Sequence, residues 1–153
     1  MRGVAVVAAA ALLSGCASDK VPITDPTGAD RAACAALIKA LPDTLDGQLR
    51  RPVDPDDALG AAWGDPPFVL RCGVGKPESY DPTAGCDSAD GVDWFIPDAA
   101  VNNPDAEAVL TTMGRSPAVE LRVPAARRPP AGAMVDLAAT IKAHTTSVAG
   151  GCH

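Results

Sequence analysis

The chain has 153 residues, 47% of them hydrophobic and 3% aromatic, which suits one small domain, because two domains would each be too small to bury a core. Its 19 acidic and 13 basic residues give a formal charge of −6. The basic residues form no cluster, which argues against nucleic acid as a partner, since phosphate binding needs grouped lysine and arginine side chains.

The first sixteen residues have the order of a secretory signal. Arg2 supplies a positive charge ahead of an unbroken apolar run over residues 4–13, which is too short for a stable transmembrane helix. The run ends in Leu-Ser-Gly-Cys, which resembles a bacterial lipobox, where the cysteine thiol is diacylated and the signal is cut just before it. We therefore expect a lipoprotein signal peptide over residues 1–15 and lipidation at Cys16.

The stretch after the lipidated cysteine is polar, contains two prolines and a glycine, and shows no hydrophobic periodicity. Residues 16–29 are therefore expected to be the lipidated cysteine and a flexible tether, and residues 30–153 a single globular domain. The anchor predicts a location outside the cytoplasm, on the outer face of the cell membrane. The membrane is thus expected as a partner through the N-terminal lipid alone, since the net negative charge does not attract anionic lipid.

Four further cysteines, an even number in an exported chain, indicate two disulfides with three possible connectivities. Their spacing excludes a zinc site held by closely spaced cysteine pairs, because no two lie within C-x₂₋₄-C distance. Cys72 ends an expected strand and Cys86 lies in the loop that returns from it, so we expect this pair to bond. Cys34 and Cys152, near the two ends of the domain, are then expected to form the second disulfide.

A first amphipathic helix is expected over residues 30–41, with Asp30 as its N-cap and Pro42 ending it. Its apolar residues recur at helical spacing: Cys34, Leu37, Ile38 and Leu41. Residues 58–63 fit a short strand or a turn of helix, and residues 68–74 alternate as a half-buried strand. Residues 75–91 contain too many Gly, Pro, Asp and Ser residues for a regular element, so a disulfide at Cys86 rather than packing should order them.

Residues 92–96 are expected to form the next strand, followed by an antiparallel pair over residues 106–113 and 118–123 that is joined by a four-residue turn. A last helix is expected over residues 131–144, with a similarly spaced apolar face: Met134, Leu137, Ala138 and Ile141. This order predicts an α+β fold, in which an antiparallel sheet of about four strands carries the N- and C-terminal helices on one face, with two disulfides.

Five short motifs follow one another behind the lipobox, in this order: Trp63-Gly64-Asp65-Pro66, Arg71-Cys72-Gly73-Val74, Val92-Asp93-Trp94-Phe95, Gly114-Arg115-Ser116-Pro117 and Val123-Pro124. With them the chain resembles the small actinobacterial lipoprotein family catalogued as domain of unknown function 3515, over roughly Cys34 to Cys152. This resemblance implies no catalytic residue, substrate or cofactor.

Two groups of side chains are candidates for metal binding. Asp81, Asp87, Asp90 and Asp93 crowd one loop as Ca²⁺ ligands would, but they lack the order and the closing glutamate of a calcium loop, so a solvated loop is the expected reading. The C-terminal group of His144, Cys152 and His153 could bind a copper or zinc ion. A disulfide at Cys152 is the simpler expectation for this cysteine. We therefore predict no metal site, with Ca²⁺ binding by the aspartate loop as the alternative.

Neither nucleotide binding nor catalysis is expected. Gly73-Val74-Gly75-Lys76 resembles part of a phosphate loop, but Pro77 follows the lysine where Ser or Thr is needed. Both histidines lie near the C-terminus, no G-x-S-x-G surrounds a serine, and no glutamate stands in an apolar context. We therefore name no catalytic and no cofactor-binding residue.

Trp94 and Phe95 are consecutive on an expected strand and must face opposite sides of the sheet. If Trp94 packs under the helices, then Phe95 and Asp93 face away and are candidate contacts for a partner, unless a loop covers Phe95 and makes it core. The expected function is that of a non-catalytic interaction or accessory module of a membrane or cell-envelope complex, whose protein partner the sequence does not identify. The alternative is a lipoprotein that binds a small ligand or a metal ion.

Overall fold

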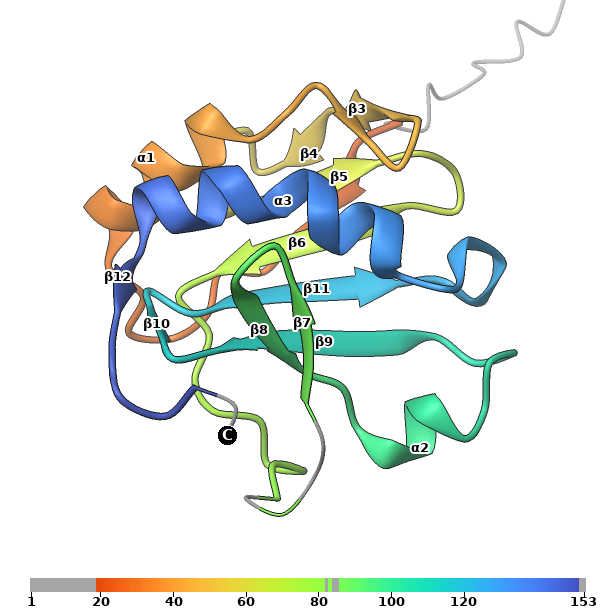
Figure 1. Cartoon of the computed structure of the whole chain (residues 1–153). Helices are drawn as coiled ribbons and strands as arrows, with labels where there is room; N and C mark the ends of the chain where they lie inside the picture. Colours follow the sequence, from red (N-terminus) through yellow and green to blue (C-terminus); the bar gives the residue numbers. More distant parts are fainter. Residues whose placement is uncertain (1–18, 82, 84–85, 152–153) are drawn as a thin grey trace, which may run out of the picture.

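The computed structural model describes residues 19–81, 83 and 86–151. They form an antiparallel sheet whose eight strands lie side by side, with two long helices on one face (Figure 1). Across the sheet, the strands follow in this order: β2 (Thr44–Leu45), β3 (Gln48–Arg51), β5 (Gly60–Trp63), β6 (Phe68–Cys72), β11 (Val119–Val123), β9 (Ala108–Met113), β8 (Val92–Phe95) and β7 (Cys86–Ala89). The predicted α+β class is confirmed, whereas the sheet has more strands than the four expected.

Shorter elements complete the described part of the chain. Two small pairs lie outside the large sheet: β1 (Val21–Pro22) runs parallel to β4 (Val53–Asp54), and β10 (Arg115–Ser116) runs antiparallel to β12 (Thr146–Ser147). The helices are α1 (Arg31–Ala40), α2 (Asp98–Val101), the 3₁₀ turn η1 (Ala125–Arg127) and α3 (Ala131–His144). Within the described residues, no helix has the length and apolarity needed to cross a membrane.

Both expected amphipathic helices form and pack on the same face of the sheet. The carboxylate of Asp30 caps α1 by accepting a hydrogen bond of 3.0 Å from the backbone N–H of Ala33. Leu37 of α1 joins Leu137 and Ile141 of α3 in the main core, which is completed by inward side chains of the strands: Trp63, Phe68, Leu70, Trp94, Leu110 and Leu121. Helical spacing and strand alternation thus predicted most of this core.

The additional strands have polar sequences. β3 reads Gln-Leu-Arg-Arg and β7 reads Cys-Asp-Ser-Ala, and neither shows the alternation that marks a half-buried strand. Each is held by backbone pairing to an apolar neighbour, β3 to β5 and β7 to β8. The expectation that residues 75–91 contain no regular element is therefore wrong for β7, because pairing to β8, rather than side-chain burial, makes it a strand.

The disulfide found among the described cysteines contradicts the expected connectivity. Cys34 bonds to Cys72, with their Cα atoms 5.5 Å apart, and neither residue is exposed. The first turn of α1 lies over the end of β6, where Leu59 packs beside the bond, so the two sulfurs meet there. The expected Cys72–Cys86 and Cys34–Cys152 pairs are therefore wrong, because chain order does not reveal which helix end covers β6. Cys86 is itself disulfide-bonded, and Cys152 lies outside the described residues.

Candidate interaction surface

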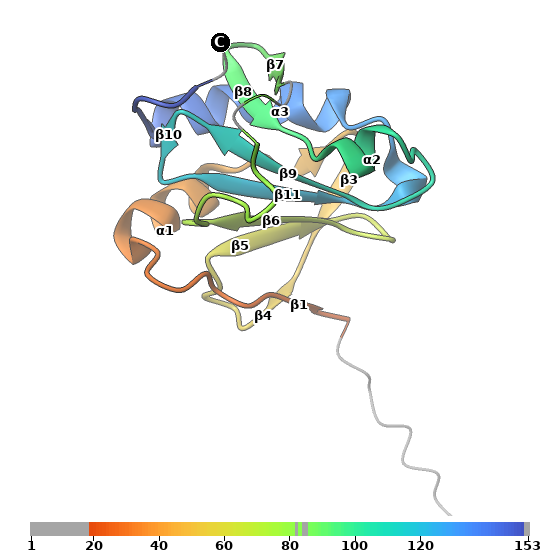
Figure 2. The same ribbon diagram turned by 90° about the horizontal axis from the view of Figure 1, so that it is seen from below.

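The described part of the expected tether is packed against the domain. Residues 21–25, called the strap below, cross the sheet face opposite the helices, where β1 pairs with β4 (Figure 2). Ile23 is 6% exposed and lies on β5, where a Cβ atom at Gly60 would come within 2.9 Å of its Cγ2. The expectation of a flexible tether up to residue 29 is thus wrong from Val21 onward, because a glycine on β5 leaves room for an apolar side chain of the strap.

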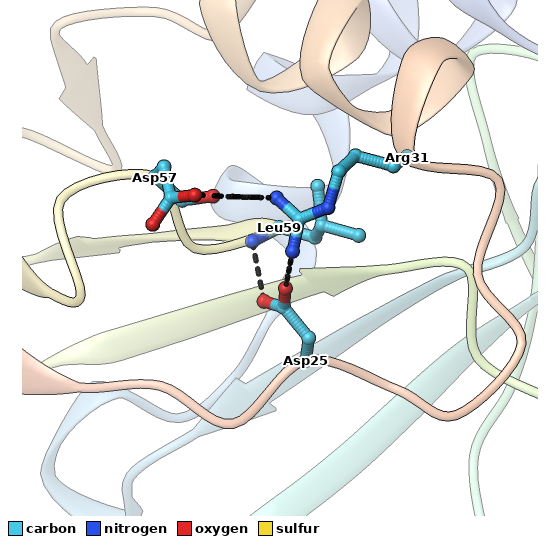
Figure 3. A network of polar contacts seen from close by, with 4 residues as sticks. All are labelled: Asp25, Arg31, Asp57 and Leu59. Carbon is cyan, nitrogen blue, oxygen red and sulfur yellow. Dashed lines mark hydrogen bonds and ion pairs between the residues drawn. The ribbon is translucent and has the colours of Figure 1, made fainter.

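A polar network fastens the end of the strap (Figure 3). One carboxylate oxygen of Asp25 accepts a 2.6 Å hydrogen bond from the backbone N–H of Leu59, and the other forms a 2.6 Å ion pair with Arg31. Arg31 also donates to the backbone carbonyl of Asp57 at 3.2 Å. The network therefore joins the strap to the start of α1 and to the β4–β5 connection.

Phe95 is not an exposed contact. It faces away from the helices, opposite Thr111 of β9, but it is only 1% exposed. The ring of Tyr80, from the loop after β6, packs edge-on against it with the ring centroids 5.5 Å apart. The expectation that Phe95 faces a partner is therefore wrong, because this loop covers it and makes it core. Asp93 lies on the same face and is half-buried.

The acidic loop residues do not converge on one point. Asp81 forms a turn of its own, in which hydrogen bonds from Thr83, first the backbone N–H and then the hydroxyl, lower the pKa of the carboxyl. Asp87 lies opposite Trp94 and Asp93 opposite Ser88, which places the two carboxylates on opposite faces of the hairpin. In residues 19–81, 83 and 86–151, no three His, Cys, Asp or Glu side chains are grouped to hold a metal ion. Of the C-terminal group, Cys152 and His153 lie outside the described residues.

A shallow groove lies beside the strap, on the sheet face opposite the helices. It is lined by charged side chains of β6 and β11. Its central pair is Arg71 and Glu120, whose closest ion-pair contact is 2.8 Å. Arg122 pairs in turn with Glu107 at 3.6 Å. Because these charges are matched within the domain, the groove offers no uncompensated charge to a ligand.

Adjoining shallow hollows mark a different surface, at the end of the sheet where β6 stops and the chain turns from β9 into β11. They are lined by residues 28–30, 33, 73–74, 115–118, 143–146 and 148, which we call the Ser116 surface. Each hollow has a volume of about 450 Å³ or less. Most of the lining residues are small and uncharged (Gly, Ala, Ser, Thr, Pro and Val), and Asp30, Arg115 and His144 supply the ionisable side chains.

Several connections hold the Ser116 surface together. The backbone N–H of Gly73 donates to the carbonyl of Ala118 at 2.8 Å, and the N–H of Val148 donates to the carbonyl of Gly114 at 2.9 Å. Arg115 reaches across to the β7–β8 hairpin and donates to the carbonyl of Gly91 at 3.2 Å. The Cys34–Cys72 disulfide lies directly behind these segments. The Ser116 surface is therefore formed by four parts of the chain that are distant in sequence, and hydrogen bonds and the disulfide hold these parts in place.

Most residues of the five sequence motifs serve the fold. Trp63 is buried and donates its indole N–H to the carbonyl of Pro42 at 3.0 Å. Gly73 has a φ of +83°, and a Cβ there would collide with the side chain of Ala29. Gly114 has a φ of +63° and lies against the backbone of Gly151. In the fourth motif, Ser116 is exposed and its neighbours are half-exposed, so this motif also contributes to the Ser116 surface.

The sequence identified residues 114–117 only as a turn, so it missed the surface that they form. Small side chains leave backbone N–H and C=O groups accessible, and shallow open hollows suit a protein segment better than a small molecule, which binds in a deeper enclosure. The one signal available was the density of turn residues near Pro117, which does not reveal that residues 28–30 and 145–148 converge there.

Comparison with known proteins supports the resemblance seen in the motifs. Neither the curated proteins nor the solved structures contain a match to this chain. A family model does match, over residues 2–149, and thus covers nearly the whole sequence. The chain belongs to the family described as protein of unknown function (DUF3515).

Proposed function

We propose that this protein is a lipid-anchored extracytoplasmic module that contributes to a membrane or cell-envelope complex by binding a partner protein through the Ser116 surface. The anchor is Cys16, behind the Leu-Ser-Gly sequence of the lipobox-like segment. The role is one of recognition, without a chemical step on a substrate.

The observation that carries this proposal is the make-up of the Ser116 surface. Its hollows adjoin one another, share Ser116 and Pro117, and are lined mostly by small uncharged residues whose positions are fixed by backbone pairing and by the disulfide. A pre-formed surface loses little conformational entropy on binding, which favours recognition. The exposed side chain of Val148, 47% accessible, adds apolar area at the rim of this surface.

The test is crosslinking in intact cells with a photoreactive phenylalanine analogue placed at Ser116. A matched control carries the same analogue at Asp105, which is exposed in the loop between α2 and β9, at the other end of the sheet. We expect a discrete crosslinked protein from position 116 that is absent from position 105.

Crosslinks of equal yield from both positions, or none from position 116 with the protein present at normal abundance, would contradict the proposed surface. The ligand-binding alternative predicts a different result. A metal ion bound in stoichiometric amount to the purified domain in native mass spectrometry would favour it over the interaction module.

A further inference from the structure

The distance between the anchor and the folded domain is set by where the strap begins. Cys16 precedes Val21 by five residues, and five residues span at most about 17 Å when fully extended. From Val21 onward the backbone is paired, since the N–H of Val21 donates to the carbonyl of Pro52 and that of Ile23 to the carbonyl of Asp54, each at 2.9 Å. The domain therefore has far less freedom than a tether up to residue 29 would allow.

The strap leaves the domain at one corner of the molecule. Figures 1 and 2 both show the chain entering beside β1 and β4, on the side opposite the C-terminal segment, the β7–β8 hairpin and β10. The corner consists of residues 20–22 and 53–56, which lie together because β1 pairs with β4 and Lys20 pairs with Asp56. β10, which contributes Arg115 and Ser116 to the Ser116 surface, lies away from this corner in both views.

We infer that the docked strap fixes the orientation of the domain on the bilayer, with the β1–β4 corner toward the lipid headgroups and the Ser116 surface away from them. This inference rests on the proposed anchor at Cys16. A short connection to a clamped strand limits rotation in a way that a long flexible linker does not. The partner would then approach from the side opposite the membrane.

Charge does not supply this orientation. The corner exposes the carboxylates of Asp54 and Asp56, and Lys20 forms an ion pair of 2.8 Å with Asp56. An acidic surface is repelled by anionic headgroups. The β1–β4 corner therefore contacts the lipid headgroups that surround the protein's own anchor, because the short connection to Cys16 keeps it close to them. We expect the orientation to be best defined on zwitterionic lipid.

Paramagnetic relaxation on phosphatidylcholine nanodiscs tests the inference. The chain from Cys16 onward, which contains every described residue, is attached through the 1,2-aminothiol of its N-terminal cysteine to a cyanobenzothiazole-modified phospholipid. A gadolinium-chelating lipid in the disc then broadens the methyl signals of nearby side chains. We expect the greatest broadening at Val21, Ile23 and Val53, and at least several-fold less at Val148.

The matched control carries an insertion of about twelve glycine and serine residues between Ser18 and Asp19, which lengthens the connection and leaves the strap docked. In this variant, the broadening of the Val21, Ile23 and Val53 methyl signals should become much closer to that of the Val148 signals. Uniform broadening of the original chain, or stronger broadening at Val148, would overturn the inference. The lipid is attached chemically in this experiment, so its result does not depend on lipidation in cells. Lipidation in cells is tested separately by substitution of Cys16.

Discussion

Single side chains show how the face of the sheet opposite the helices is closed. Ile23 of the strap covers Gly60 at one end of this face, and Tyr80 covers Phe95 at the other. Between them, Arg71 and Glu120 neutralise each other. A face that an antiparallel sheet often leaves to solvent is thus partly covered in this domain by the strap and by the loop after β6.

The burial of Phe95 predicts a large effect on stability. Phe95→Ala removes a nearly inaccessible ring and should lower the free energy of unfolding by about 3–5 kcal/mol, because the surroundings relax only partly into the cavity. The matched control is Leu49→Ala, since Leu49 is 72% exposed and should change stability by less than about 0.5 kcal/mol. Urea unfolding measures both, and a similar effect from the two substitutions would contradict the burial of Phe95.

The Asp25 network predicts that two substitutions at one position differ. Asp25→Ala leaves the buried backbone N–H of Leu59 without its acceptor and should cost about 1–3 kcal/mol of stability. Asp25→Asn keeps an oxygen for that N–H and loses only the ion pair with Arg31, whose side chain is 60% exposed, so it should cost less than about 1 kcal/mol. Equal losses in chemical denaturation would show that the hydrogen bond to Leu59 is not the stabilising contact.

At the scale of elements, the helices and strands whose apolar residues recur periodically could be predicted from the sequence. Both long helices, the β9–β11 pair and the alternation of β6 are confirmed, because their core-facing residues recur with the period of the element. β3, β7 and the strap were missed, since backbone pairing and a single contact such as Ile23 on Gly60 leave no periodic pattern. The Ser116 surface was missed for a related reason: its parts converge only in the folded chain.

The position of α1 over β6 predicts the disulfide pattern. Non-reducing peptide mapping should recover Cys34 joined to Cys72, and Cys86 joined to Cys152, the partner that remains if Cys16 carries lipid. The first bond closes a loop with a sequence separation of 38, worth about 4 kcal/mol in the chain-entropy model. Replacing both Cys34 and Cys72 by alanine should lower stability by up to that amount. Recovery of a Cys34–Cys152 peptide would contradict this pattern.

At the scale of the whole molecule, the two ends of the described chain contribute to different regions of the domain. The strap ties the segment next to the proposed anchor to the sheet, whereas residues 145–148 complete the Ser116 surface beside β10. The proposed anchor and the proposed recognition surface are therefore at separate places on one domain. Changes to the anchor should consequently alter where the protein resides without altering its fold.

Substitution of the anchor residue tests that separation. Cys16→Ser removes the thiol that lipidation requires, and each buried methylene of a lost acyl chain takes away about 0.8 kcal/mol of membrane affinity. We expect the variant to move from the membrane to the soluble fraction on cell fractionation, while its purified domain keeps the same unfolding midpoint, because Cys16 precedes the packed residues by sequence. A Ser116→Ala variant serves as the control that should stay with the membrane. Membrane partitioning of the Cys16→Ser protein equal to that of the unchanged chain would remove the lipid from the proposal and leave the Ser116 surface to be tested in solution.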